Sequence, residues 1–231
     1  MGRIRPVSLS DQAKEYIMEA IKEGRLQPGD RVSESGLAQE LGISQAPVRD
    51  AIRELSMLGF LQREPNKGSV VHSFSPKERC EIYEVRAALE SLAARLAATR
   101  WTEADVERLE AILDQLIEAG HNKDLNRMTR LNIQFHEMII EVAGNTLLHQ
   151  LWKRLEFGYW TIFTARSASW DLEYLANRHR QLLEGLKTRD PEVAAEAMRH
   201  HIEDLAKPLL HPDDVEMSVD NEAAWETATR R

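Results

Sequence analysis

Three histidines and one asparagine occupy positions where inward-facing polar side chains are unusual. Asn132 and His136 lie four residues apart beside an apolar stripe, and His179 and His201 lie among apolar residues at helical spacing. Residues three or four apart share one helix face, so each imidazole is expected to point into a helical assembly. An unpaired polar group there is costly. Convergent imidazoles are typical ligands of Zn²⁺ or Ni²⁺, with open positions left for water or an anion.

Other interpretations of these histidines stay open at this level. Each one alone is also explained as a hydrogen-bonded core residue or an exposed side chain. A bound metal could activate water, so a metal-dependent hydrolase is an alternative function. Against an enzyme, the sequence lacks HExxH, GxSxG and a Gly-rich phosphate loop, and Glu137 points about 100° away from His136 around the helix. A bundle that only dimerises is the third possibility.

The elements that must position these residues are expected to be long helices. Capping residues and short connections separate six stretches of helical period, which predict an antiparallel all-helical bundle over 75–210. Residues 211–231 are polar and lack periodicity, and we expect a loose tail there. The predicted helices are Ser75–Ala98, Glu103–Ala119, Asp124–Val142, Leu147–Ala165, Trp170–Thr188 and Pro191–Leu210.

The first part of the chain, residues 1–74, predicts a winged helix-turn-helix. Within Gly42–Leu61, Val48, Ile52 and Leu55 recur at helical spacing and make a buried stripe. Two helices are expected before this stretch, and a strand pair around a Pro-Asn-Lys-Gly turn is expected after it. The fold class is therefore mostly α, with one small β-wing. The preceding helices are Leu9–Glu23 and Glu34–Leu41, and the strand-like runs are 60–64 and 69–72.

The face opposite this stripe carries long, nitrogen-rich side chains that suit a DNA major groove. Gln45, Arg49 and Arg53 are four residues apart and therefore stack along one side of the helix. Lys67 at the wing tip could reach a phosphate or the minor groove, although such a hairpin alone is also explained as a surface ribbon. The predicted DNA-contacting residues are Ser44, Gln45, Ala46, Arg49, Arg53, Lys67 and Gly68.

Composition indicates a globular chain, and the charge is unevenly distributed between the winged helix-turn-helix of residues 1–74, the head, and the remainder, the body. The 42% hydrophobic and 29% charged residues exclude a disordered protein, and no stretch approaches the length of a membrane span. Residues 1–75 carry 10 basic and 10 acidic side chains, so the net charge of −8 belongs to the remainder. A neutral head on an acidic body fits DNA reading by the head alone. The N-terminus has no apolar signal region and there is one cysteine, so we expect a reducing cytoplasm.

Residues 9–72 resemble the winged-helix head of the GntR family of bacterial transcription regulators. The resemblance rests on LAQELGISQAPVRDAIREL followed by GFLQREPNKGSVV, which follow the family pattern LA..LGVSRTPVREAL..L...GL and its wing. The chain departs from that pattern at Gln45 and Ala46, where arginine and threonine are common. Both positions lie where bases are contacted, so the departures concern the operator sequence rather than DNA binding itself. The resemblance implies a DNA-binding transcription regulator.

Residues 76–210 resemble the FadR-type C-terminal domain of one GntR subfamily. The matching segments are YEVRAALE, LNIQFHEMIIEVAGN, HRQLLEGLKTRD and AAEAMRHHI. The resemblance implies that one divalent metal is held in the bundle and that a small carboxylate effector binds on it. The implied ligands are Asn132, His136, His179 and His201.

The resemblance also assigns roles to two positions in this domain. Asn132 stands where the family often has aspartate, which removes one negative charge and should weaken metal affinity. Arg86, in YEVRAALE, is the matching candidate for an effector clamp through a guanidinium–carboxylate contact. A surface salt bridge from Arg86 to Glu90 is the alternative role. Taken together, we expect a repressor that dimerises and binds a two-fold symmetric operator.

Overall fold

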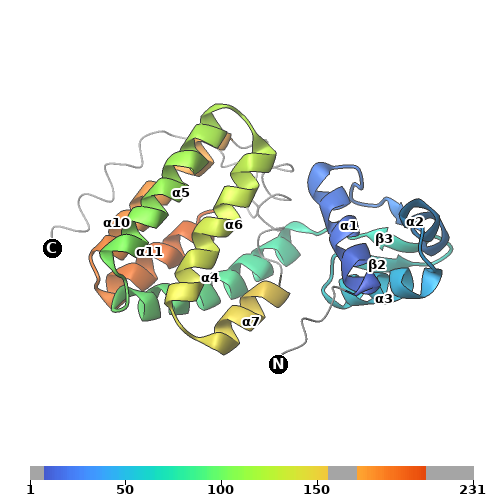
Figure 1. The fold of residues 1–231 in the computed structure, drawn as a ribbon, viewed down its shortest axis with the longest axis horizontal. Helices are drawn as coiled ribbons and strands as arrows, with labels where there is room; N and C mark the ends of the chain where they lie inside the picture. The colour runs from blue at the N-terminus through green and yellow to red at the C-terminus, as the bar shows by residue number, and fades with distance from the viewer. Residues whose placement is uncertain (1–7, 156–170, 207–231) are drawn as a thin grey trace, which may run out of the picture.

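The computed structural model describes residues 8–155 and 171–206. These residues form a mostly helical chain with one three-stranded antiparallel sheet, so the fold class predicted from the sequence is confirmed. The N-terminal helices and strands, coloured from blue to teal, lie beside the helices of the remainder, and a short segment joins the two (Figure 1). Within the described ranges, no helix is long and apolar enough to cross a membrane.

The N-terminal part is a helix-turn-helix followed by a wing. Ser8 begins α1 with a reciprocal capping box, and Gly24 ends it in the left-handed region at φ 76°. The sheet has the order β1-β3-β2, so the last strand lies between the other two. Its elements are α1 (Leu9–Glu23), β1 (Arg31–Val32), α2 (Glu34–Leu41), α3 (Gln45–Met57), β2 (Leu61–Glu64) and β3 (Gly68–Val71).

Helix α3 is held against the rest of this part by the predicted apolar stripe. Val48, Ile52 and Leu55 are at most 4% exposed, and Ala51 is buried beside them. On the wing, Leu61 of β2 pairs with Val71 of β3, and both side chains are buried. The stripe and the wing base thus form one small core that leaves the opposite face of α3 in solvent.

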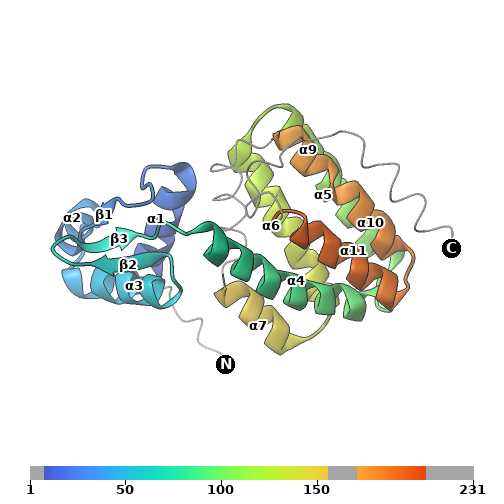
Figure 2. The ribbon, with the colours of Figure 1, turned by 180° about the vertical axis from the view of Figure 1, so that it is seen from behind.

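The C-terminal part is a helical bundle that begins at a strong cap. The Ser75 hydroxyl accepts the Glu78 backbone N–H at 3.2 Å, and the Glu78 carboxylate accepts the Ser75 N–H at 2.8 Å. In Figure 2, α11 lies along α4, while α9 and α10 follow one another beside α5. The elements are α4 (Pro76–Ala98), α5 (Glu103–His121), α6 (Leu125–Val142), α7 (Thr146–Arg154), α9 (Leu172–Asn177), α10 (His179–Lys187) and α11 (Pro191–Glu203).

Several predicted helices differ in extent from the observed ones: α5 continues through Gly120 to His121, and α7 ends at Arg154. The predicted helix Trp170–Thr188 is interrupted at Arg178, where α9 ends and α10 begins. Nδ1 of His179 lies 3.2 Å from the carbonyl oxygens of Leu175 and Ala176, which an uninterrupted helix gives to backbone N–H groups one turn later. Helix α11 ends at Glu203. Residues 156–165 and 207–210 of the predicted helices, and the predicted tail, lie outside the described residues.

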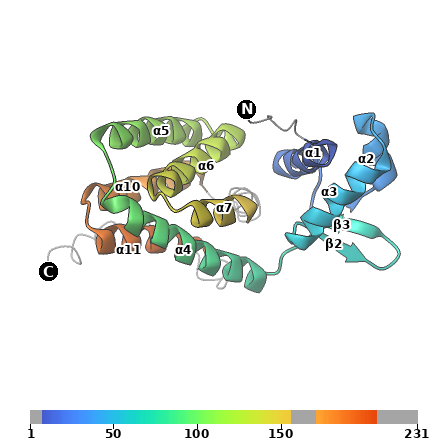
Figure 3. The ribbon, with the colours of Figure 1, turned by 60° about the horizontal axis from the view of Figure 1, so that its bottom comes forward.

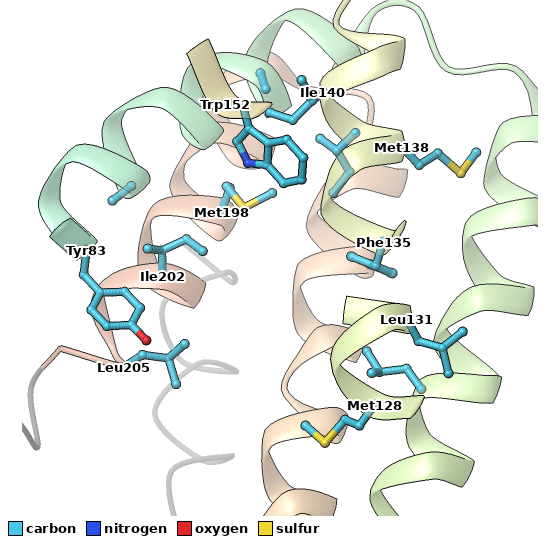
Figure 4. Close-up of a cluster of buried hydrophobic side chains, with 14 of the residues drawn as sticks. Tyr83, Met128, Leu131, Phe135, Met138, Ile140, Trp152, Met198, Ile202 and Leu205 are labelled. Carbon is cyan, nitrogen blue, oxygen red and sulfur yellow. The ribbon is translucent and has the colours of Figure 1, made fainter. Parts of the chain in front are cut away.

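The bundle core brings α4, α6, α7 and α11 together. Figure 4 shows buried apolar side chains from these helices facing a shared interior, among them Phe135 of α6, Trp152 of α7 and Met198 of α11. In Figure 3, α7 lies beside the middle of α4. Gly185 allows a close approach of α10 and α11, because a Cβ there would lie 2.5 Å from that of Ala197. This approach carries His179 and His201 toward one another.

Candidate DNA-binding surface and buried histidine cluster

The residues predicted to contact DNA lie on two exposed surfaces of the N-terminal part. Those at and along α3 form what we call the recognition face, and the remaining two form the wing tip between β2 and β3. Ser44 precedes α3, and its hydroxyl makes no capping hydrogen bond. Gly68 begins β3 in the left-handed region at φ 83°, a conformation that glycine tolerates at a tight turn. The recognition face is Ser44, Gln45, Ala46, Arg49 and Arg53, and the wing tip is Lys67 and Gly68.

Two of the predicted DNA-contacting cations are paired with acids in the free protein. Nε of Arg49 lies 2.9 Å from the Glu34 carboxylate of α2, and this hydrogen bond raises the pKa of Arg49. Nζ of Lys67 lies 2.9 Å from Glu64 of β2. Both pairs are exposed and therefore exchange readily in water. A DNA phosphate or base must therefore displace these carboxylates or share the cation with them. The sequence pattern did not predict these pairs.

The four predicted metal-site residues meet in the bundle interior. Asn132 and His136 come from α6, His179 begins α10, and His201 comes from α11; each is at most 7% exposed. Ring centroids of His179 and His201 are 4.4 Å apart, and His136 lies 5.5 Å and 5.3 Å from them. One nitrogen from each ring falls within 4.8 Å of the others. Three helices far apart in the sequence thus converge on one small volume.

The contacts of His179 leave two lone pairs facing each other. Its Nδ1 lies 3.2 Å from two backbone carbonyl oxygens, which can only accept, so the ring proton is on Nδ1. Its Nε2 lies 2.9 Å from Oδ1 of Asn132, a second acceptor. Two acceptors then face each other. A cation bound by both atoms removes this conflict, and so does a 180° turn of the Asn132 amide, which lets its NH₂ group donate to Nε2. The first solution is what a metal site requires.

The environment of His136 leaves one of its ring nitrogens without a partner. Its Nδ1 lies 2.5 Å from Oε2 of Glu90, although the contact lacks the alignment of a hydrogen bond. Its Nε2 is buried and has no hydrogen-bond partner. An orphaned ring nitrogen beside two other imidazoles fits a coordinated ion, because each lone pair then gains a partner.

Electrostatics keep the three imidazoles uncharged. Burial lowers the pKa of His136, and the adjacent Glu90 partly opposes this effect. Burial, the neighbouring imidazoles and the Arg178 cation hold the pKa values of His179 and His201 well below the ordinary 6.5. Neutral imidazole is the form that binds metal, so near pH 7 the cluster is in the protonation state that coordination requires.

Arg86, the predicted effector clamp, is buried next to this cluster. Its side chain is 2% exposed, and its Nε donates to Oε1 of Glu90 at 2.7 Å. The alternative role for Arg86 was a surface salt bridge to Glu90 at i+4; the pair is present, but it lies in the core. The same Oε1 accepts Nε1 of Trp152 from α7 at 3.0 Å. Sequence reasoning placed no function on Glu90; its only signal was the four-residue spacing from Arg86.

Arg178 secures the end of α11 beside the cluster. Its Nη2 donates to the backbone carbonyl of His201 at 2.8 Å and lies 3.7 Å from the Asp204 carboxylate. Burial lowers the pKa of this guanidinium, and Asp204 opposes the effect. The residue therefore fixes α11 relative to the α9–α10 break and adds positive charge near the imidazoles.

Comparisons with known proteins agree with this two-part architecture. The family described as bacterial regulatory proteins, gntR family, matches residues 9–71, and the FCD domain matches residues 81–204. A relative from Paenarthrobacter nicotinovorans, described as a probable D-xylose utilization operon transcriptional repressor, is 32% identical over 87% of this chain and 88% of its own. The HTH-type transcriptional regulator McbR of Escherichia coli K12 is 29% identical over 87% of this chain and 94% of its own.

Solved structures support the fold. The structure of E. coli McbR/YncC has a TM-score of 0.74 at 23% identity and covers 90% of this chain and 99% of its own. A GntR regulator from Rhodococcus sp. RHA1 has a TM-score of 0.70 at 19% identity, covering 87% and 97%. The matched families and relatives are transcriptional regulators rather than enzymes, which excludes the hydrolase alternative. The chain belongs to the GntR family of DNA-binding transcription regulators, in the branch whose winged helix-turn-helix is followed by an FCD domain.

Proposed function

We propose that this regulator is a repressor whose operator affinity is controlled by a small carboxylate effector bound with a divalent metal in the bundle. The observation that carries the proposal is the convergence of three buried imidazoles, in which Nε2 of His136 has no hydrogen-bond partner and Nε2 of His179 lies 2.9 Å from Oδ1 of Asn132. A protein interior rarely leaves such atoms without a partner. A cation shared with His201 satisfies all of them at once.

The donor set favours a transition metal. Three neutral imidazoles and one amide oxygen suit Zn²⁺ or Ni²⁺, whereas Mg²⁺ and Ca²⁺ prefer oxygen ligands. When bound, such an ion supplies positive charge that anchors an anionic effector. None of the four ligands Asn132, His136, His179 and His201 is anionic, so the ion's full charge remains for that purpose.

Arg86 is proposed to contact the effector carboxylate. Its guanidinium is buried beside the cluster and already pairs with Glu90. An incoming carboxylate must therefore displace Glu90 or share Arg86 with it. Displacement would disturb Glu90, which also holds Trp152 of α7. Effector binding would then change how α7 packs on α4, and a ligand that favours one packing shifts the population toward it.

The repressor sense and the dimer are parts of the same proposal. The Paenarthrobacter relative carries a repressor's name, which supports repression here. Dimerisation is supported by exposed apolar side chains on two helices that contact each other: Val85 and Leu92 of α4 are 50% and 42% exposed, and Leu147 and Leu151 of α7 are 66% and 40% exposed. Two copies joined there would read a two-fold symmetric operator.

Metal removal tests the proposal. We expect dialysis against a chelator to lower the melting temperature of wild type, and added Zn²⁺ or Ni²⁺ to restore it. Elemental analysis of the restored protein should find about one ion per chain. Acetate, succinate and citrate, used as probe acids, should raise the melting temperature further only when metal is present, and an effective acid should change operator affinity in mobility shifts.

Two variants assign the ion to the buried cluster. His179→Ala should lose stoichiometric metal. His149→Gln is the matched control, because His149 lies with Glu137 and Glu141 in a partly exposed group where Lys153 already pairs with Glu137 at 2.9 Å. The control should keep its metal. Unchanged melting after chelation, or stoichiometric metal in His179→Ala, would place effector sensing elsewhere.

A further inference from the structure

Glu90 is a fully buried carboxylate that contacts three helices at once. It is 0% exposed on α4, between Arg86 of the same helix, His136 of α6 and Trp152 of α7. Its two oxygens have different partners. Oε1 accepts both Nε of Arg86 and Nε1 of Trp152, whereas Oε2 faces Nδ1 of His136 at 2.5 Å. Oε1 therefore links α4 to α7, whereas Oε2 faces the histidine cluster.

The surroundings of Glu90 keep it ionised. Nε of Arg86, a guanidinium that is itself only 2% exposed, lies 2.7 Å from Oε1 of Glu90, and a buried ion pair of this kind favours the charged carboxylate. An ionised carboxylate only accepts hydrogen bonds. An unprotonated Nδ1 at 2.5 Å would set its lone pair against this negative oxygen, whereas a protonated Nδ1 is attracted by it. The contact thus selects one of the two neutral forms of the ring.

We propose that Glu90 is the positioning residue of the histidine cluster: it keeps the proton of His136 on Nδ1 and thereby turns the Nε2 lone pair toward His179 and His201. The inference rests on the proposed metal site for its functional meaning, but the proton position is a property of the metal-free protein. A carboxylate behind a metal-binding histidine orients the ring and raises its basicity. Glu90 also places one negative charge next to a ligand set that has none of its own.

A purely structural role for Glu90 makes a different prediction. If Glu90 only ties α4 to α7, its important partner is Trp152, and the face toward His136 is incidental. Glu90→Gln separates the two roles, because the amide oxygen still accepts from Arg86 and Trp152 while an NH₂ group replaces Oε2. That group donates to Nδ1 of His136, so the ring proton should move to Nε2 and block the metal-facing position. Trp152→Phe removes the structural hydrogen bond and leaves Oε2 unchanged.

Nitrogen NMR of metal-free protein with isotope-labelled histidine measures the proton position directly. The His136 signal is assigned by its absence in His136→Gln. We expect the proton on Nδ1 in wild type and in Trp152→Phe, and on Nε2 in Glu90→Gln. The inference is overturned if wild type carries the proton on Nε2, an outcome that needs no variant to fold, or if Glu90→Gln leaves it on Nδ1.

Zn²⁺ titration against a competing chelator supplies the second readout. Glu90→Gln should raise the dissociation constant roughly 10- to 100-fold, the usual effect of losing such a partner, and Trp152→Phe should leave it nearly unchanged. Equal weakening in both variants would assign Glu90 a structural role and contradict the inference. If wild type binds no Zn²⁺, the proposed metal function fails, while the proton position still decides the role of Glu90.

Discussion

Acidification of the metal-free protein should destabilise the bundle over a pH range where most carboxylates are still ionised. His179 and His201 are buried, and their pKa values lie well below the ordinary 6.5 that they regain on unfolding. Below about pH 6.5 the unfolded chain binds more protons than the folded chain, so the free energy of unfolding falls as the pH falls. The stabilising effect is complete above pH 6.5 and is lost progressively below it.

The magnitude follows from the number of buried rings. A histidine that stays neutral in the folded state loses about 1 kcal/mol of stability between pH 6.5 and 5.5, approaching about 1.4 kcal/mol for each further unit. His179 and His201 together should therefore remove about 2 kcal/mol over that first unit, against a typical total of about 5–15 kcal/mol. His136 contributes less, because the Glu90 carboxylate beside it favours its charged form.

Urea unfolding followed by tryptophan fluorescence measures this loss in the bundle alone. Residues 1–75 contain no tryptophan, whereas Trp101 and Trp152 are buried in the bundle. At constant protein concentration and with a chelator present, His201→Gln should roughly halve the pH dependence between pH 6.5 and 5.5. His200→Gln, one residue earlier and exposed, should leave it unchanged. Equal pH dependence in wild type and His201→Gln would refute the claim that these rings are held neutral by burial.

Two further predictions concern the outer surfaces. Arg49→Ala should weaken operator binding roughly tenfold to a hundredfold in mobility shifts while leaving the melting temperature nearly unchanged, because its side chain is exposed and the stripe beneath it is intact; the same variant binding the operator as wild type does would show that α3 is not the recognition element. Leu147→Asp should weaken self-association by about tenfold or more in sedimentation. Leu147 is 66% exposed in the single chain, and dimerisation would bury the new charge at this position. An unchanged dissociation constant would show that α7 is not part of the interface.

Local patterns in the sequence were sufficient for most of the architecture. Helical period, caps and turn residues depend on neighbours within a few positions, so the stripe of α3, the capping box at Ser75 and the wing turn could be predicted before any packing was known. The same period placed His136 on the inner face of its helix, and the structure has it buried. Inward orientation is a local property, which is why it was predictable.

Which buried polar groups meet was decided only by the tertiary structure. Arg86 and Glu90 formed a recognisable i+4 pair, but their burial and the contact of Glu90 with His136 depend on how α4 packs against α6. Periodicity states which side of a helix faces inward, whereas the angle and offset between helices determine what lies opposite. The identity of a partner 46 residues away in the sequence follows from that packing and from nothing in the local pattern.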